Sequence, residues 1–143
     1  MKDLAIFLNV WAVVGPLVGV ALGSWLATKN QRKHWLMDNK RAEYRKLLTT
    51  LSDCGSKFLT VYGHVPALTD STERRMIREA ARSSANVIYN RLFIASELRK
   101  LNIMDRWTNA TSTLTKTHNG LAFTKELDTI MDDVRSVALK DFS

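Results

Sequence analysis

The side chains in this sequence that are able to do chemistry are few and scattered. The three histidines, His34, His64 and His118, lie far apart, and none has a second histidine or a cysteine three or four positions away. No glycine-rich phosphate loop, HExxH motif or CxxC motif is present. The single cysteine, Cys54, lies among apolar residues at helical spacing, which is typical of a buried side chain and not of a nucleophile. We therefore expect no enzyme activity, no metal site and no cofactor.

Two clusters of cations remain after this search. The first spans residues 29–46 and follows directly on an apolar segment, to which its members Lys29, Arg32 and Lys33 lie nearest. Beside an anionic membrane surface each such cation contributes about 1 kcal/mol of binding free energy. Contact with anionic lipid is one interpretation of this cluster, and a simple topology signal is the other.

The second cluster comprises Arg74, Arg75, Arg78 and Arg82. On a helix these four residues share an arc of about 100°, near an N-terminus where cations oppose the helix dipole. A solvated face is one interpretation, and contact with a lipid headgroup, a nucleic acid or an acidic protein is the alternative. The formal net charge is +7, but no nucleic-acid-binding motif accompanies it, so we do not expect nucleic-acid binding.

The first cluster follows an apolar segment, Leu4 to Ala27, in which only Asn9 and Ser24 are polar. As a helix this segment would rise about 36 Å, enough to cross a hydrocarbon core of about 30 Å. A cleaved signal peptide, the alternative, would need a positively charged start and a shorter apolar core. We therefore predict a transmembrane anchor over residues 1–28. The cations that follow it predict an inner-membrane, single-pass protein with its N-terminus outside and its C-terminal part in the cytoplasm.

One face of this segment is built from small side chains and a single amide. Its members are Asn9, Ala12, Gly15, Gly19 and Gly23. In lipid, small residues let helix backbones approach closely, and an amide that faces another helix finds a partner there. The face therefore predicts association with a second copy or with another membrane helix. The alternative is that glycine is simply common in membrane helices and that Pro16 kinks this one.

Residues 29–143 show helical spacing and no alternating β pattern. Their apolar stripes lie over 44–62, 77–98, 101–114 and 123–137. Turns are predicted at Gly63–Asp70, where Asp70 and Glu73 resemble a capping box, and at Thr117–Gly120. The predicted fold class is thus all-α, with one N-terminal transmembrane helix followed by a cytoplasmic antiparallel helical bundle of three long helices and a short one.

Arg91 lies on the apolar side of its predicted helix, unlike the second cation cluster. A guanidinium keeps its proton, so a buried one must pair with a carboxylate or cap helix carbonyls. Glu43 and Asp133, both at the borders of apolar stripes, are the candidate carboxylates. The alternative is that Arg91 extends to solvent. Burial would give Arg91 a structural role.

The stretches QRKHWLMDNKRAEYRKLLTTL and RLFIASELRKLNI resemble segments of uncharacterised bacterial single-span membrane proteins. This resemblance covers residues 29–103 and implies a membrane anchor with a helical domain, but no activity. The architecture is also similar to membrane-anchored helical proteins of bacterial antiphage systems, one of which has a HEPN-like bundle and assembles into a pore. HEPN nucleases carry an arginine followed five residues later by histidine. Here Ser96 stands five residues after Arg91, so RNA cleavage is not implied.

Two functional hypotheses follow. The first is a non-enzymatic single-span membrane protein that self-associates through its span and presents a helical bundle to a cytoplasmic partner, as an adaptor or accessory subunit. The alternative is an oligomeric membrane-perturbing or pore-forming effector of an antiphage system. Either hypothesis predicts membrane lipid and a second copy of the chain as partners, and the first adds an unknown cytoplasmic protein.

Overall fold

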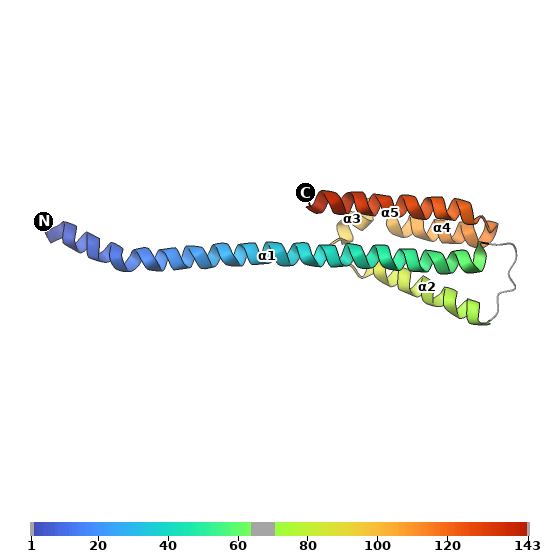
Figure 1. Ribbon diagram of the computed structural model, residues 1–143, viewed down its shortest axis with the longest axis horizontal. Coiled ribbons are helices and arrows are strands. Elements are labelled where there is room, and N and C mark those ends of the chain that lie inside the picture. The colour runs from blue at the N-terminus through green and yellow to red at the C-terminus, as the bar shows by residue number, and fades with distance from the viewer. Residues whose placement is uncertain (1, 64–70, 143) are drawn as a thin grey trace. The chain divides into compact units, whose positions relative to one another are not determined.

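The computed structural model describes residues 2–63 and 71–142, with side chains from Val18 onward. This described part consists of the helices α1 (Lys2–Tyr62), α2 (Ser71–Tyr89), α3 (Ala95–Lys100), α4 (Ile103–Thr117) and α5 (Gly120–Phe142) (Figure 1). No strand occurs within these ranges, so the all-α prediction is confirmed. The chain divides into two compact units, Met1–Asp38 and Asn39–Ser143.

The predicted transmembrane helix is not found. In the part of the chain that the structure describes, no helix combines the length and the apolar character that a membrane crossing requires. The predicted transmembrane anchor, the single-pass topology and the inner-membrane location are therefore wrong.

The second unit is a helical bundle around one apolar core, in which α2, α4 and α5 lie beside the C-terminal half of α1 (Figure 1). The apolar stripes predicted from spacing supply most of this core. Trp107 of α4 lies at its centre, with its ring centroid 6.1 Å from those of both Phe58 and Phe123. The fully buried side chains are Leu47, Leu51, Cys54, Ser84, Ile94, Ile103, Leu114, Ile130 and Val134.

The predicted second helix, which would continue to Leu98, is interrupted. α2 ends at Tyr89, the backbone is irregular up to Ile94, and α3 begins at Ala95. The interruption shifts the register of the apolar stripe, so Leu92, predicted to be buried, is 80% exposed. Spacing alone did not reveal this break because the apolar residues on both sides of it fit one helical period.

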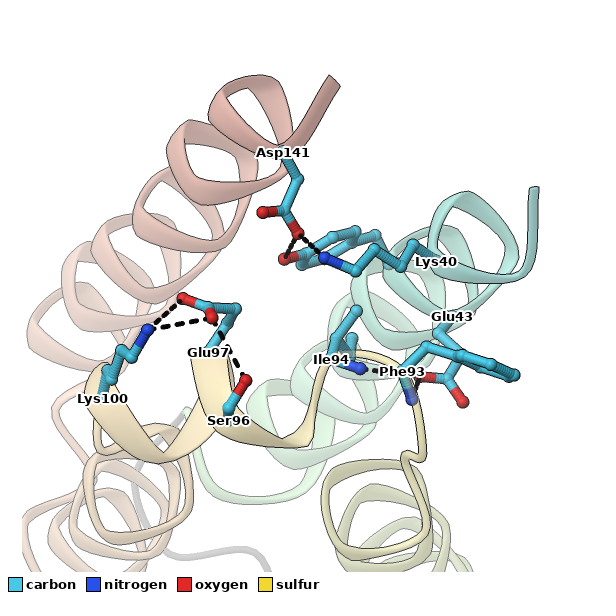
Figure 2. Close-up of polar contacts among 9 residues, drawn as sticks. Lys40, Glu43, Phe93, Ile94, Ser96, Glu97, Lys100 and Asp141 are labelled. Carbon is cyan, nitrogen blue, oxygen red and sulfur yellow. Dashed lines mark hydrogen bonds and ion pairs between the residues drawn. The ribbon is translucent and has the colours of Figure 1, made fainter. Parts of the chain in front are cut away.

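A carboxylate from α1 stabilises the break between α2 and α3. The side chain of Glu43 accepts hydrogen bonds from the backbone N–H groups of Leu92, Phe93 and Ile94, at 3.0, 2.9 and 3.2 Å. Figure 2 shows the side chain of Glu43 next to Phe93 and Ile94. Ile94 is the N-cap residue of α3 and makes no side-chain cap of its own. Glu43 therefore supplies the acceptors that N–H groups at a helix start need.

The turn predicted at Thr117–Gly120 is confirmed, since α4 ends at Thr117 and α5 begins at Gly120. His118 closes α4 in the left-handed conformation, with φ 53°. Its Nδ1 atom lies 3.1 Å from the carbonyl oxygen of Tyr62, which joins this turn to the end of α1. The turn predicted at Gly63–Asp70, and Asp70 of the capping box, lie outside the described residues except for Gly63.

Ion pairs join the helices at the edge of the core. Arg106 of α4 contacts two carboxylates of α5, Glu126 at 3.1 Å and Asp133 at 2.6 Å. At the far end of α5, Asp141 Oδ2 accepts hydrogen bonds from Lys40 Nζ at 3.0 Å and from Tyr44 Oη at 2.9 Å (Figure 2). Burial raises the pKa of Asp141, but these two donors outweigh it, so the pKa of this carboxyl lies below its ordinary value.

Replacing Glu43 by alanine should lower the free energy of unfolding by about 1.5–3 kcal/mol, because three N–H groups lose a charged acceptor. Urea unfolding of the full chain measures this change. Hydrogen exchange at the amides of Leu92, Phe93 and Ile94 should also become faster. The control is Glu79→Ala, which removes an exposed carboxylate at 4.0 Å from Arg75 and should cost less than about 0.5 kcal/mol. Equal destabilisation by both variants would contradict the role given to Glu43.

Replacing Asp141 by asparagine should lower the free energy of unfolding at neutral pH by about 1–2 kcal/mol, because charge assistance to Lys40 and Tyr44 is lost. Since the pKa of Asp141 is lowered in the folded state, its contribution is complete above the ordinary pKa of 3.8 and is lost as pH falls through the lowered value. The difference between variant and wild type should therefore stay constant down to about pH 4 and narrow below it. Asp128→Asn, at an exposed position of the same helix, is the control. A difference that widens in acid would contradict this interpretation.

Candidate protein-binding surface

The second cation cluster forms an exposed surface on α2, here called the arginine face. Its residues are Arg74, Arg75, Arg78 and Arg82, and all four side chains are exposed. Arg74, Arg78 and Arg82 follow one another at four-residue spacing, and α2 therefore places them in one row along its surface.

Most of the charge on the arginine face is uncompensated. Arg75 lies 4.0 Å from Glu79, in a pair whose side chains are both about 70% exposed, so this contact is weak. Within the described residues, Arg74, Arg78 and Arg82 have no acidic partner. Other surface cations of the bundle do pair with acids, for example Lys100 with Glu97 at 3.0 Å and Arg135 with Asp132 at 2.7 Å.

The position of Arg74 on the arginine face destabilises α2. The helix begins at Ser71, so Arg74 lies in its first turn, where the unpaired N–H groups carry a partial positive charge. A cation there costs about 0.3–1 kcal/mol. Glu73, in the same turn, has the sign that the dipole favours. Arg74 therefore does not stabilise the helix that carries it, and this is typical of side chains that serve binding.

The cluster of Lys29, Arg32 and Lys33 lies on the first unit, and all three side chains are exposed. The Nζ atom of Lys29 lies 5.2 Å from the ring centroid of Trp25, close enough for a cation–π contact. The predicted role of these cations as a topology signal depended on a membrane span, and no span is found among the described helices.

The small-residue face of α1 is described only in part. Asn9, Ala12 and Gly15 lie outside the residues whose side chains are described. A Cβ atom added to Gly19 or Gly23 would meet nothing within 4 Å, so both glycines border open space in the single chain. Close helix packing at this face therefore needs a second molecule, and it stays a prediction.

The apolar side chains around these glycines are also exposed. Trp25 and Trp35 are each 60% exposed. The other large apolar residues exposed on this unit are Val18, Val20, Leu22, Leu26 and Leu36. Leu22 and Leu26 share one side of the helix next to the two glycines, and exposed apolar side chains grouped in this way typically mark an interaction site.

Arg91 is partly buried and caps the end of α2. Its Nε atom donates to the carbonyl oxygen of Val87 at 2.6 Å. Neither predicted carboxylate pairs with it, because Glu43 accepts from the backbone of residues 92–94 and Asp133 pairs with Arg106. Of the predicted alternatives, the structure therefore shows carbonyl capping, on an arginine that keeps part of its surface in solvent.

The described residues do not assemble a reactive centre. Cys54 is fully buried, and burial raises the pKa of its thiol, so the reactive thiolate is disfavoured. His118 is held in the turn before α5, and His64 lies outside the described residues. No group of three histidine, cysteine or acidic side chains that could hold a metal ion occurs in the described ranges. The absence of a cofactor and of enzyme activity stays a prediction.

A polar groove between α1 and α2 is the feature that the sequence did not predict. It encloses about 450 Å³ and is lined by Lys46, Thr49, Thr50, Asp53, Ser83, Asn86, Val87 and Arg91. Helical spacing places the polar residues 46, 49, 50 and 53 on one side of α1, and this side could have been predicted from the sequence. Whether they face Ser83 and Asn86 depends on how α2 packs against α1, and this packing could not be predicted from the sequence.

Comparisons with known proteins found no match that would identify these surfaces. Neither the models of protein families, nor curated proteins, nor solved structures gave a match to the chain.

Proposed function

We propose that the protein is a non-enzymatic adaptor or accessory subunit whose helical bundle binds an acidic partner protein through the arginine face of α2. The observation that carries this proposal is the row of Arg74, Arg78 and Arg82, which is exposed and has no acidic partner within the described residues. An acidic surface placed against this row would supply the missing carboxylates, and guanidinium groups bind carboxylates in a bidentate geometry.

A protein surface fits the arginine face better than a nucleic acid does. Glu79 lies beside Arg75 and would repel a continuous phosphate backbone. No aromatic side chain lies between the arginines to stack on bases. A partner with mixed charge and an excess of acids matches this pattern, because its own cations can meet Glu79.

The triple variant Arg74→Gln, Arg78→Gln, Arg82→Gln tests the proposal, because binding and stability should change in opposite directions. Its affinity for a helical glutamate-rich peptide, measured by fluorescence anisotropy near physiological salt, should fall by about tenfold or more. Its free energy of unfolding should rise by about 0.3–1 kcal/mol, since Arg74 no longer opposes the helix dipole.

The matched control removes three exposed cations elsewhere on the bundle, through Lys116→Gln, Lys125→Gln and Arg135→Gln. The two triple variants have the same net charge, so equal losses of affinity would mean that only total charge matters and would contradict the proposal. A glutamine-rich peptide should not bind. Tighter binding of a double-stranded RNA oligonucleotide than of the acidic peptide would also contradict it.

We further propose that copies of the chain associate through the side of α1 that carries Gly19, Gly23, Leu22 and Leu26. Leu22 and Leu26 are 55% and 52% exposed, so their apolar surface is available to a second copy. Leu22 and Leu26 flank the open glycines Gly19 and Gly23, so a second helix can approach closely at this point.

Replacing Gly19 by isoleucine should weaken self-association without disturbing the single chain, because nothing lies within 4 Å of an added Cβ atom. Sedimentation velocity of the full chain measures the association, and circular dichroism checks the fold. Val18→Ile, which adds one methylene outside the glycine face, is the control and should associate like the wild type. A monomeric wild-type chain, or equal association of both variants, would contradict this proposal.

A further inference from the structure

The polar groove between α1 and α2 carries a set of hydrogen-bond donors that neither the core nor the arginine face uses. Lys46 lies on the α1 wall, Ser83 and Asn86 lie on the α2 wall, and Arg91 lies just beyond the end of α2. The volume of about 450 Å³ falls within the range of small-molecule sites. We propose that this groove binds a small molecule through a phosphoryl group.

The two cations of the groove are available for an anion. Lys46 has no acidic partner within the described residues, and its side chain is exposed. Arg91 uses its Nε atom on the carbonyl oxygen of Val87 at 2.6 Å, which holds the guanidinium in place and leaves its two amino groups for a ligand. The carbonyl end of α2 alone would repel an anion, and the guanidinium of Arg91 reverses the sign of the charge there.

Neutral donors from both walls complete the set. Within the described part of the chain the hydroxyl groups of Thr49, Thr50 and Ser83 have no hydrogen-bond partner. Other helical threonines, such as Thr60 and Thr124, donate to the carbonyl oxygen four residues earlier.

The amide of Asn86 adds a further donor. Its Oδ1 atom accepts from Asn90 Nδ2 at 2.6 Å, which leaves its own amino group as a donor. Hydroxyl, amide, ammonium and guanidinium donors that converge on one groove are the chemistry that binds phosphate oxygens.

One acid also lines the groove, and it is already neutralised. Asp53 pairs with Lys57 at 2.8 Å, so its carboxylate does not face an incoming anion alone. The lining therefore keeps an excess of positive charge from Lys46 and Arg91. A phosphoryl group, with up to two negative charges and three acceptor oxygens, matches this excess better than a monovalent anion does.

Calorimetric titration of the full chain with inorganic phosphate and with a nucleoside monophosphate, at constant ionic strength set by chloride, tests this proposal. We expect saturable binding of both probes, and Lys46→Gln should weaken it by about tenfold, because a charged donor is lost. Lys46 is exposed and has no ion-pair partner among the described residues, so this variant should fold normally. Arg91→Lys, which keeps the charge but loses the anchored amino groups, should weaken binding as well.

Lys125→Gln is the matched control, since it removes an exposed cation on α5 and should bind both probes like the wild type. Tighter binding of the nucleoside monophosphate than of phosphate would show that the ligand extends along the groove, and equal binding would show that the phosphoryl group alone is recognised. Phosphate that binds no better than chloride, or equal losses in Lys46→Gln and Lys125→Gln, would overturn the proposal. None of these variants touches the arginine face, so failure here leaves the proposed function standing.

Discussion

The bundle depends on one carboxylate at the point where the chain leaves α2. Past Tyr89 the backbone is no longer helical, and three successive N–H groups would lack acceptors without Glu43. Because Glu43 belongs to α1, the same contact that satisfies this turn also fixes the turn to the longest helix of the chain. α3 begins directly after this turn, so the contact also holds the start of α3 against α1. Unsatisfied N–H groups in this partly buried turn would be a direct cost to the fold.

Helical spacing was sufficient to predict the all-α class and most of the core. Leu47, Leu51, Leu114 and Ile130 repeat with the period that buries one side of a helix, and all four are fully buried. The break after Tyr89 was not predicted, because the signal for it lies in Glu43, almost fifty residues earlier in the sequence. A contact between residues so far apart in the sequence cannot be recognised from local composition or periodicity.

The prediction of a membrane span from the sequence was wrong for a different reason. The span was predicted from the length and apolar character of residues 4–27, but no helix in the described part of the chain is a candidate membrane span. Among the candidate binding surfaces, the arginine face could be predicted from the sequence because all of its residues lie on one helix. The groove could not be predicted, because its two walls come from separate helices. For the same reason the two carboxylates predicted as candidates for Arg91 were wrong, whereas the carbonyl capping predicted as an alternative is observed. Residues that share a helix face are predictable from spacing, and residues that meet across helices are not.

The buried thiol of Cys54 has a practical consequence. It is the only cysteine of the chain, it lies in the core against α2, and burial keeps it protonated. An alkylating reagent therefore reaches it only when the bundle opens as a whole. The rate of labelling of the unmodified protein then counts opening events directly, so the native chain contains its own probe of global unfolding.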